Sequence, residues 1–470
     1  MTNDAIIEES IQGTATVLKN TLQSKSKHKK VYIETYGCHM NFSDSEIVAS
    51  ILKDQNYITT DNEYDADLLF INTCSIRDKA EQTVRNRLNQ LKNIKKKNSK
   101  VKVGILGCMA ERLKTKLLEE EQLVDMVVGP DSYRKLPEMI DETNTGQKSV
   151  NVFLSKEETY EEIKPVRIDT NGVSAFISIM RGCDNMCSFC VVPFTRGRER
   201  SRDPFSILAE AKDLFDRGYK EVCLLGQNVD SYSWKNPETN ININFADLLR
   251  MVAETDQSLR VRFSTSHPKD ITDQVLHAIK KHDNICNYIH LPVQSGNSEV
   301  LERMNRTYDR AWYMERIKAI WNIIPDCAIS TDIITGFCGE TEAQHKDTLS
   351  MMEFVKYDLA YMFKYSERPG TLAEKKYADD IPEQVKRKRL NEIIEKQQKH
   401  SEHRNKKHLN EVFLVLIEGV SKRSKEHLFG RNDQNKIVIF PKGKHKIGEY
   451  VNVFVNRCTS ATLFGDVVYN

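Results

Sequence analysis

The stretch FISIMRGCDNMCSFC, residues 176–190, is an apolar run followed at once by three closely spaced cysteines. Phe176–Met180 is predicted to form a buried strand. Cys183, Cys187 and Cys190 then place three thiolates in one short loop, enough to hold a 4Fe-4S cluster and leave its fourth iron open. Structural zinc usually takes four ligands, and this loop contains neither a fourth cysteine nor a histidine. We therefore favour an iron–sulfur cluster over a zinc site or simple burial of the thiols.

From this loop onward, apolar strands and helical patterns alternate through residues 169–400. Helices are predicted at Pro204–Arg217 and Tyr308–Ile323, among others. Six strand–helix units suit a full or partial TIM-like (β/α)6 barrel, whose active site lies at the C-terminal ends of its strands. The six predicted strands are Phe176–Met180, Val222–Leu225, Val261–Ser264, Tyr288–Leu291, Ala328–Ile334 and Ala360–Phe363.

A second alternating region precedes the barrel, at residues 30–145. Strands are predicted at residues 31–37, 67–72 and 101–107, with helices between them at Ile47–Leu52 and Ala80–Leu91. This order predicts a Rossmann-like parallel sheet with helices on its faces. The polar residues 146–168 are predicted to be a linker, and residues 1–29 a disordered tail.

Three further cysteines, Cys38, Cys74 and Cys108, each follow a predicted strand of this first domain. Parallel strands bring their C-terminal ends to one edge of the sheet, so these thiols are expected to converge. Gly37 and Gly107 precede two of them and permit tight turns beside a bulky cofactor. We favour a second three-cysteine cluster, and the alternative is three buried core thiols. The other five cysteines show no such arrangement and are mostly expected in the core: Cys223, Cys286, Cys327, Cys338 and Cys458.

The C-terminal region is basic on an otherwise balanced chain, whose net charge is +2. Lys386–His408 has apolar residues at helical spacing, and residues 386–410 hold nine Lys/Arg against three Asp/Glu. Short strands follow at Val412–Ile417, Ile437–Phe440 and Tyr450–Val455, which predicts a small β-barrel at residues 401–466.

The whole chain has 470 residues, of which 39% are hydrophobic and 29% charged, as expected of a globular protein with sizeable cores. No apolar run approaches the length of a membrane helix or a signal peptide, so we expect a cytoplasmic protein with no membrane partner. Eleven cysteines without a secretion signal favour metal or redox chemistry over disulfides.

Several motifs resemble one family. The loop Cys183–Cys190, with an aromatic residue before its last cysteine, resembles the signature of the radical S-adenosylmethionine (SAM) superfamily. Tyr36–Asn41 resembles the opening of the methylthiotransferases. The tRNA branch, that of the MiaB-type tRNA-2-methylthio-N6-isopentenyladenosine synthases, is the most similar over residues 30–465. It is supported by Val192–Arg202, Gly226–Val229 and Arg262–Pro268, while Leu428–Arg431 with Lys436–Val438 resembles an RNA-binding TRAM domain.

Two residues depart from the family pattern. His39 stands where the family usually has glutamine, which puts the hydrogen bonding around the second cysteine set in doubt. Cys338 stands where the family usually has proline in a turn, which puts the backbone shape of that turn in doubt. Neither departure removes a cysteine ligand.

The resemblance implies two 4Fe-4S clusters and SAM. One cluster cleaves SAM to a radical that takes hydrogen from carbon 2 of N6-isopentenyladenosine at position 37 of tRNA. The auxiliary cluster on Cys38, Cys74 and Cys108 delivers the methylthio group. The resemblance also implies an electron donor such as flavodoxin, and we expect a monomer.

Individual binding roles are less specific. Phe189 is expected to pack on the adenine of SAM, or only within its own loop. Residues at predicted strand ends are expected to line the barrel mouth, where Asp332 is equally suited to capping a turn. These residues are Gly226, Gln227, Ser264, Gln294, Arg306 and Asp332. The alternate arginines Arg196, Arg198, Arg200 and Arg202, and Arg431, are expected to contact RNA phosphates, the alternative being a solvated face.

Three other functions compete with this one. A sibling methylthiotransferase would act on another tRNA adenosine or on a ribosomal protein. An iron–sulfur electron-transfer or carrier protein would need the cysteines but would not cleave SAM. A plain RNA-binding protein with structural zinc would contain no iron or sulfide.

Overall fold

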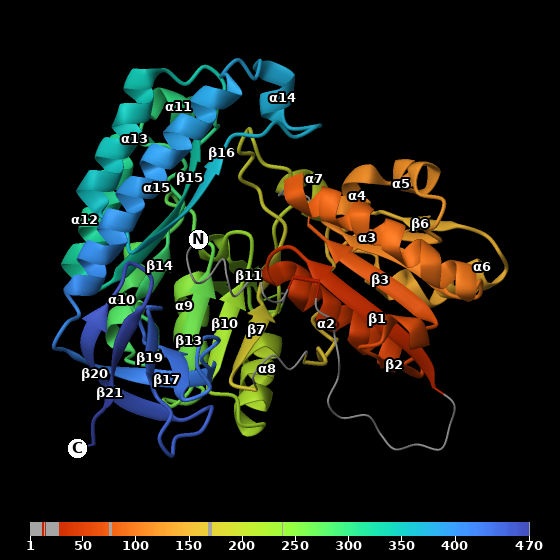
Figure 1. Cartoon of the computed structure of the whole chain (residues 1–470), viewed down its shortest axis with the longest axis horizontal. Helices are drawn as coiled ribbons and strands as arrows, with labels where there is room; N and C mark the ends of the chain where they lie inside the picture. The colour runs from red at the N-terminus through yellow and green to blue at the C-terminus, as the bar shows by residue number, and fades with distance from the viewer. Residues whose placement is uncertain are drawn as a thin grey trace.

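The structure is a computed structural model of the chain and describes residues 12–13, 15, 28–74, 78–167, 172–236 and 238–469. Figure 1 shows three domains, with the N-terminal one in red and orange, the central one from yellow to light blue, and the C-terminal barrel in dark blue. The predicted combination of a parallel sheet, a partial barrel and a small β-barrel is confirmed.

The N-terminal domain is a six-stranded, fully parallel sheet in the order β2-β1-β3-β4-β5-β6. The strands are β1 (Lys29–Tyr36), β2 (Tyr57–Thr59), β3 (Leu68–Thr73), β4 (Lys102–Gly107), β5 (Met126–Val128) and β6 (Ser149–Asn151). The helices are α2 (His39–Lys53), α3 (Asp78–Lys97), α4 (Cys108–Leu113), α5 (Thr115–Glu120) and α6 (Leu136–Asn144). The three strands predicted from the sequence are all present.

Both faces of this sheet are covered, because alternate side chains of each strand point to opposite sides. Val31 and Ile33 of β1 pack against α2 and α6, whereas Tyr32 between them packs on the opposite face with α3, α4 and α5. The sheet is therefore doubly wound, and its C-terminal edge is free to carry a site.

The predicted linker is wrong in its first part. Residues 149–151 form β6 and extend the sheet beyond β5. Tyr160 is buried in the same domain, where its hydroxyl donates to the Pro130 carbonyl (2.9 Å). The acid-rich composition of this segment concealed one buried strand and one buried aromatic ring.

Most of the predicted disordered tail lies outside the described residues, but residues 12, 13 and 15 are ordered against β1. The Gly13 amide donates to the Thr35 carbonyl (2.9 Å), and Ala15 forms an antiparallel bridge with Glu34. The Gln12 side chain bonds the amide and the carbonyl of Gly37 (2.7 and 2.8 Å). The prediction of disorder is contradicted at these three residues.

The central domain contains two three-stranded parallel sheets, in the orders β13-β10-β7 and β14-β15-β16. A parallel bridge from Val261 to Ile285 joins them into a partial barrel of six strands. Its strands are β7 (Ser174–Ser178), β10 (Glu221–Leu225), β13 (Arg260–Ser264), β14 (Tyr288–His290), β15 (Ala328–Thr335) and β16 (Leu359–Lys364). Smaller strands are β8 (Met180–Arg181), β9 (Arg200–Ser201), β11 (Ser233–Lys235) and β12 (Asn242–Asn244).

Most helices of the central domain cover the outside of this barrel, whereas α7 (Val192–Arg196) packs against α4 of the N-terminal domain. The others are α8 (Pro204–Asp216), α9 (Phe245–Ala253), α10 (Asp273–Lys281), α11 (Ser298–Arg303), α12 (Arg310–Ile323), α13 (Glu342–Val355), α14 (Leu372–Lys376) and α15 (Glu383–Lys406). The N-terminal domain lies beside the open β7 edge, where α2 packs against β7.

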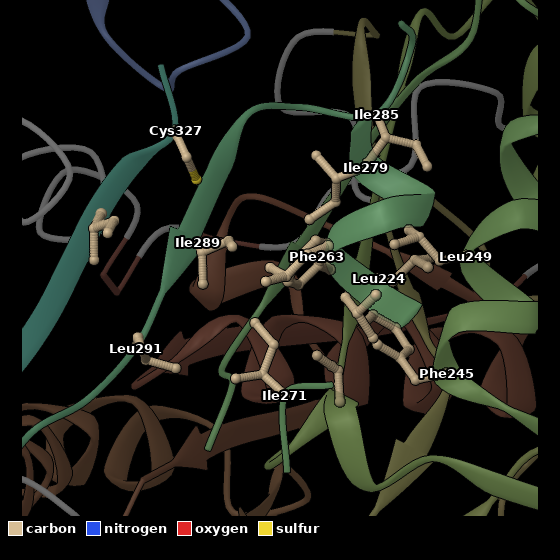
Figure 2. Close-up of a cluster of buried hydrophobic side chains, with 14 of the residues drawn as sticks. Leu224, Phe245, Leu249, Phe263, Ile271, Ile279, Ile285, Ile289, Leu291 and Cys327 are labelled. Carbon is tan, nitrogen blue, oxygen red and sulfur yellow. The ribbon is translucent and has the colours of Figure 1, made fainter. Parts of the chain in front are cut away.

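Figure 2 shows part of the barrel core, in which strand side chains meet those of the surrounding helices. Phe263 of β13 packs edge-on against Phe245 of α9, with ring centroids 5.3 Å apart. Cys327 is buried in this core, as expected, and Cys286 and Cys338 are also buried. Cys223 and Cys458 are only half-buried.

The C-terminal domain is a closed barrel in the order β17-β18-β19-β21-β20. Its strands are β17 (Val412–Val420), β18 (His427–Arg431), β19 (Ile437–Pro441), β20 (Tyr450–Cys458) and β21 (Leu463–Val467). The predicted boundary at residue 401 is wrong, because α15 continues to Lys406 and packs along the central domain.

The turn between β18 and β19 docks on the N-terminal ends of the central strands. Arg260 donates to the Arg431 carbonyl (2.7 Å), and Arg262 to the Asn432 carbonyl (2.6 Å). The small barrel therefore lies at the end of the central barrel opposite its C-terminal mouth. Within the described part of the chain, every helix is too short or too polar to cross a membrane.

Candidate functional site

The loop of the first cysteine triplet leaves β8 and is fixed by the segment between α11 and α12. The Ser188 amide donates to the Met304 carbonyl (2.8 Å), and the Asn305 side chain donates to the Met186 carbonyl (2.6 Å). The Ala373 amide at the start of α14 donates to the Ser188 carbonyl (2.7 Å). The backbone of the cysteine loop is thus held by contacts on two sides.

Arg306 is aimed at this triplet. Its Nη1 donates to the Cys187 sulfur (3.2 Å), its Nη2 to the Pro292 carbonyl (2.9 Å), and its Nε to the Tyr308 hydroxyl (3.0 Å). The guanidinium is therefore fixed on every side. The sequence predicted Arg306 at the barrel mouth, and the structure places it directly on a cysteine ligand candidate.

Burial controls the protonation of these thiols. It raises the pKa of Cys183 well above its usual range and that of Cys190 to about 12, and the closeness of the other thiols of the triplet adds to each increase. Without a bound metal the two groups are neutral thiols at pH 7. Loading a cluster must therefore release protons.

The second triplet lies at the C-terminal edge of the N-terminal sheet. Cys38 precedes α2, Cys74 follows β3, and Cys108 begins α4. Gly37 and Gly107 have φ angles of +138° and +87°, which L side chains rarely adopt. The predicted turns beside Cys38 and Cys108 therefore do require glycine.

The three thiols of the second triplet influence one another and a nearby arginine. A hydrogen bond from Cys74 lowers the pKa of Cys38 to about 6 against the effect of burial, and the positive charge of Arg196 adds to this decrease. Burial raises the pKa of Cys108, and the Arg196 charge opposes that increase. The predicted convergence of Cys38 and Cys74 is therefore visible in the structure, although their role as ligands stays a prediction.

Buried amides beneath this triplet were not predicted from the sequence. The Cys38 thiol donates to Asn41 Oδ1 (3.3 Å), and Asn41 Nδ2 donates to Asn72 Oδ1 (3.1 Å). Asn72 Nδ2 in turn donates to the Ser45 hydroxyl (2.9 Å). His39, the departure from the family pattern, stacks on Phe176 of β7 with ring centroids 4.6 Å apart. The second triplet is thereby packed directly against the central domain.

No three Cys, His, Asp or Glu side chains of the described residues gather closely enough to hold a single metal ion. A cubane binds each ligand to a different iron, so it does not require such a meeting point. Three thiols on each side, with an arginine beside each set, fit the thiolate ligation of iron–sulfur clusters.

The alternate arginines are not a phosphate-binding stripe. Arg196 donates to Asp44 Oδ2 (2.7 Å), and Arg200 lies 3.0 Å from Asp131, both across the domain interface. Arg202 pairs with Glu210 inside the central domain. All three are buried and paired with carboxylates, which does not support the predicted RNA contacts. Arg198 is different, because its side chain is 80% exposed.

Arg431 was also predicted to contact RNA. Its Nε donates to Glu418 Oε1 at 2.7 Å, and the side chain is largely buried. Its positive charge is therefore neutralised within the C-terminal barrel, and the structure does not support a phosphate contact by this residue.

The barrel mouth contains buried polar atoms for which the described residues provide no hydrogen-bond partner. These include both amide atoms of Gln227 and Oε1 of Gln294, two residues predicted from the sequence. One further atom of this kind, Asn228 Oδ1 just beyond β10, was not predicted from the sequence. Buried polar groups normally have partners, so this set identifies a candidate site for a polar ligand.

The remaining predicted residues lie at the same end of the barrel. Ser264 contacts the Thr265 hydroxyl (3.2 Å), and Asp332 lies 3.5 Å from His290. Gly226 packs against Met180. Phe189 packs against a cluster that includes Phe337 and Cys338, which agrees with the alternative role of loop packing.

Three family models match separate parts of the chain. They are the Uncharacterized protein family UPF0004 at residues 30–129, the Radical SAM superfamily at residues 177–352 and the TRAM domain at residues 406–468. The tRNA-2-methylthio-N(6)-dimethylallyladenosine synthase of Amoebophilus asiaticus is 59% identical over 450 residues, which cover 93% of this chain and 92% of the relative. This chain belongs to that synthase family.

The synthase of the same name from Christiangramia forsetii is 55% identical over 479 residues, covering 99% of this chain and 98% of the relative. The resemblance of the sequence motifs to this synthase family is thus confirmed. Among solved structures, the radical SAM methyltransferase TsrM from Kitasatospora setae, with cobalamin and a [4Fe-4S] cluster bound, has a TM-score of 0.55 at 12% identity. The match covers 74% of this chain and 77% of TsrM, and it supports the fold alone.

Proposed function

We propose that this chain is a radical SAM methylthiotransferase that places a methylthio group on carbon 2 of N6-isopentenyladenosine at position 37 of tRNA. Membership of the synthase family supports the reaction and the substrate. The observation that carries the proposal is the meeting of two cysteine triplets at one domain interface. Helix α4, which begins at Cys108, packs against α7, which begins two residues after Cys190, although the two helices belong to different domains.

The proposal assigns one 4Fe-4S cluster to Cys183, Cys187 and Cys190, and a second, the auxiliary cluster, to Cys38, Cys74 and Cys108. When bound, the clusters and SAM supply the radical that removes a non-acidic hydrogen and the sulfur that replaces it. The chain supplies orientation: Arg306 fixes Cys187, and the Asn41–Asn72 network fixes Cys38.

The buried polar atoms at the barrel mouth suit the polar groups of SAM. Gln227, Asn228 and Gln294 offer both donors and acceptors from neighbouring strand ends. Their burial also excludes water, which strengthens each hydrogen bond to a ligand. We therefore propose Gln227 and Gln294, with Gly226, Ser264 and Asp332 beside them, as contacts of SAM.

A tRNA bound to both the C-terminal barrel and the mouth of the central barrel must span a long distance, because these two places lie at opposite ends of the central barrel. Helix α15 connects the two ends: Lys386 meets Gly336 beyond β15, and Asn405 donates to the Thr459 carbonyl in the C-terminal barrel (2.8 Å). Its 24 residues correspond to about 36 Å. The exposed cations of α15, such as Lys388, would hold the RNA body, and Arg198 would contact phosphates near the site.

We further propose that the protein works in the cytoplasm, where its tRNA substrate is found, and takes electrons from a carrier such as flavodoxin. Both cysteine triplets come from one chain, so a monomer provides the complete site.

The test is mass analysis of tRNA nucleosides after reaction with the anaerobically reconstituted protein, SAM and a reductant. We expect 2-methylthio product from tRNA that carries isopentenyladenosine, and none from the unmodified tRNA or from a ribosomal peptide. Product from the peptide would instead establish the sibling activity. Metal analysis should give about eight iron and eight sulfide per chain, and zinc alone would refute the proposal.

A further inference from the structure

Asp270 connects the loop of the first cysteine triplet with the mouth of the central barrel. It lies in the segment between β13 and α10, and its side chain is 20% exposed. Its Oδ2 accepts a hydrogen bond from Asn228 Nδ2 at 2.7 Å and another from Asn185 Nδ2 at 3.3 Å, and His267 Nδ1 lies 3.4 Å from the same oxygen. Asn185 belongs to the cysteine loop, whereas Asn228 follows β10. One carboxylate oxygen thus holds two amides from different parts of the site.

The bond to Asp270 determines how the Asn228 side chain is oriented. An ionised carboxylate only accepts hydrogen bonds, so the NH₂ group of Asn228 must meet it rather than the carbonyl oxygen. The amide is planar, and its Oδ1 therefore points away from Asp270. Asn228 is 1% exposed, and no atom of the described residues donates a hydrogen bond to this Oδ1. A buried acceptor is costly to leave without a donor, which indicates that a ligand supplies one.

The place of Asn228 in the barrel suits contact with a ligand. The amide of the next residue, Val229, donates to the Thr265 carbonyl (3.0 Å), so Asn228 lies where the C-terminal ends of β10 and β13 meet. The preceding residue, Gln227, has both of its amide atoms buried without a partner among the described residues. Two neighbouring side chains at the barrel mouth thus have polar atoms available to the same ligand.

We propose that Asp270 is a positioning residue, which orients Asn228 so that its Oδ1 accepts a hydrogen bond from a donor group of SAM. This inference rests on the proposed function, in which SAM binds at the barrel mouth. The second bond of Asp270, to Asn185, holds the cysteine loop beside the same amide. One carboxylate therefore positions both the loop that carries the cysteines and the amide that contacts SAM.

The test is the affinity of the anaerobically reconstituted protein for SAM, measured by equilibrium dialysis without turnover. Asp270→Ala leaves the Asn228 amide free to turn and should raise the dissociation constant of SAM about tenfold, the scale of one hydrogen bond. Asn228→Ala should raise it by about the same factor. Asp270→Asn keeps the shape of the side chain and an oxygen that accepts, so we expect a smaller increase of about threefold. An unchanged affinity in both Asp270 variants would overturn the proposal.

A double-variant cycle separates positioning from a general loss of structure. If Asp270 acts through Asn228, adding Asp270→Ala to Asn228→Ala should change the dissociation constant by less than about twofold. Effects that multiply in the double variant would overturn the proposal. Asn185→Ala removes only the bond to the cysteine loop and should leave the affinity within about twofold of the wild type. A tenfold loss in Asn185→Ala would show that Asp270 acts through the loop instead, which would also overturn the proposal.

Asp347→Ala is the matched control. Asp347 is also half-buried and accepts a hydrogen bond from an asparagine amide, Asn297 Nδ2 at 2.7 Å, but it belongs to α13 on the outside of the barrel. Its replacement should leave the affinity for SAM unchanged, and a loss equal to that of Asp270→Ala would overturn the proposal. A wild-type protein that holds iron and sulfide but binds no SAM would refute the proposed function, and the role of Asp270 with it.

Discussion

Replacing Asp44 by asparagine should destabilise the junction between the N-terminal and central domains strongly. Asp44 is fully buried and accepts hydrogen bonds from Arg181 at 2.9 Å and from Arg196 at 2.7 Å. The substituted amide would preserve the shape of the side chain but remove the negative charge that both guanidinium groups contact directly. Arg181 would keep a weaker partner, Asp131 at 3.6 Å, whereas Arg196 would lose the carboxylate with which it pairs among the described residues.

Breaking a buried ion pair typically costs about 3–5 kcal/mol, because the remaining charge stays buried and uncompensated. We expect the free energy of unfolding to fall by about 3 kcal/mol, the lower end of that range, since Arg181 retains Asp131. Anaerobic urea unfolding followed by circular dichroism measures this change. The control is Asp216→Asn, which removes an exposed pair with Lys212 and should cost less than about 0.5 kcal/mol. A loss for Asp44→Asn below about 1 kcal/mol would refute the view that this carboxylate holds the domains together.

Three further predictions concern single residues. Gly37→Ala should lower the free energy of unfolding by about 1–3 kcal/mol and reduce the iron content, because a Cβ there would lie 2.5 Å from the Cβ of Cys74. Gly146→Ala is the control, since Gly146 also has a positive φ but open space around it, and its iron content should be unchanged. Equal iron losses in the two variants would contradict this prediction. Burial lowers the pKa of His267 to about 2, so between about pH 6.5 and pH 2 the unfolded chain binds a proton that the folded chain does not bind, and stability falls as the pH falls. His267→Gln should flatten that decrease in acid unfolding curves, and an unaltered curve would show that His267 does not contribute. Arg198→Ala should weaken tRNA binding and reduce the slope of the logarithm of the binding constant against the logarithm of salt concentration by about one. Filter binding at several salt concentrations measures this slope. An unchanged slope would exclude a phosphate contact by Arg198.

Local patterns predicted the features that depend on neighbouring residues. The alternation of strand and helix patterns predicted the order of the elements. The cysteines that follow strands predicted a site at the edge of the sheet, because parallel strands end on the same side. The positive φ angles of Gly37 and Gly107 follow from the same turns.

Features that depend on distant partners could not be predicted in this way. The spacing of Arg196, Arg200 and Arg202 is equally compatible with a solvated face and with burial. Burial depends on carboxylate partners such as Asp44, which pairs with Arg196 and is distant from it in the sequence. Tyr160 and β6 were missed because an acid-rich segment resembles a linker until its partners are placed beside it. Asn228 lies within a motif that resembles the family, yet only its burial, with an Oδ1 that no described residue satisfies, distinguishes it from a surface residue.

In the proposed function, the second cysteine triplet allows a radical enzyme to insert sulfur into its substrate. The most direct test is the triple variant Cys38→Ala, Cys74→Ala and Cys108→Ala, assayed with isopentenylated tRNA, SAM and a reductant. We predict that it retains about four iron per chain and still cleaves SAM, but forms no 2-methylthio nucleoside by mass spectrometry. Formation of that product by the triple variant would contradict the assignment.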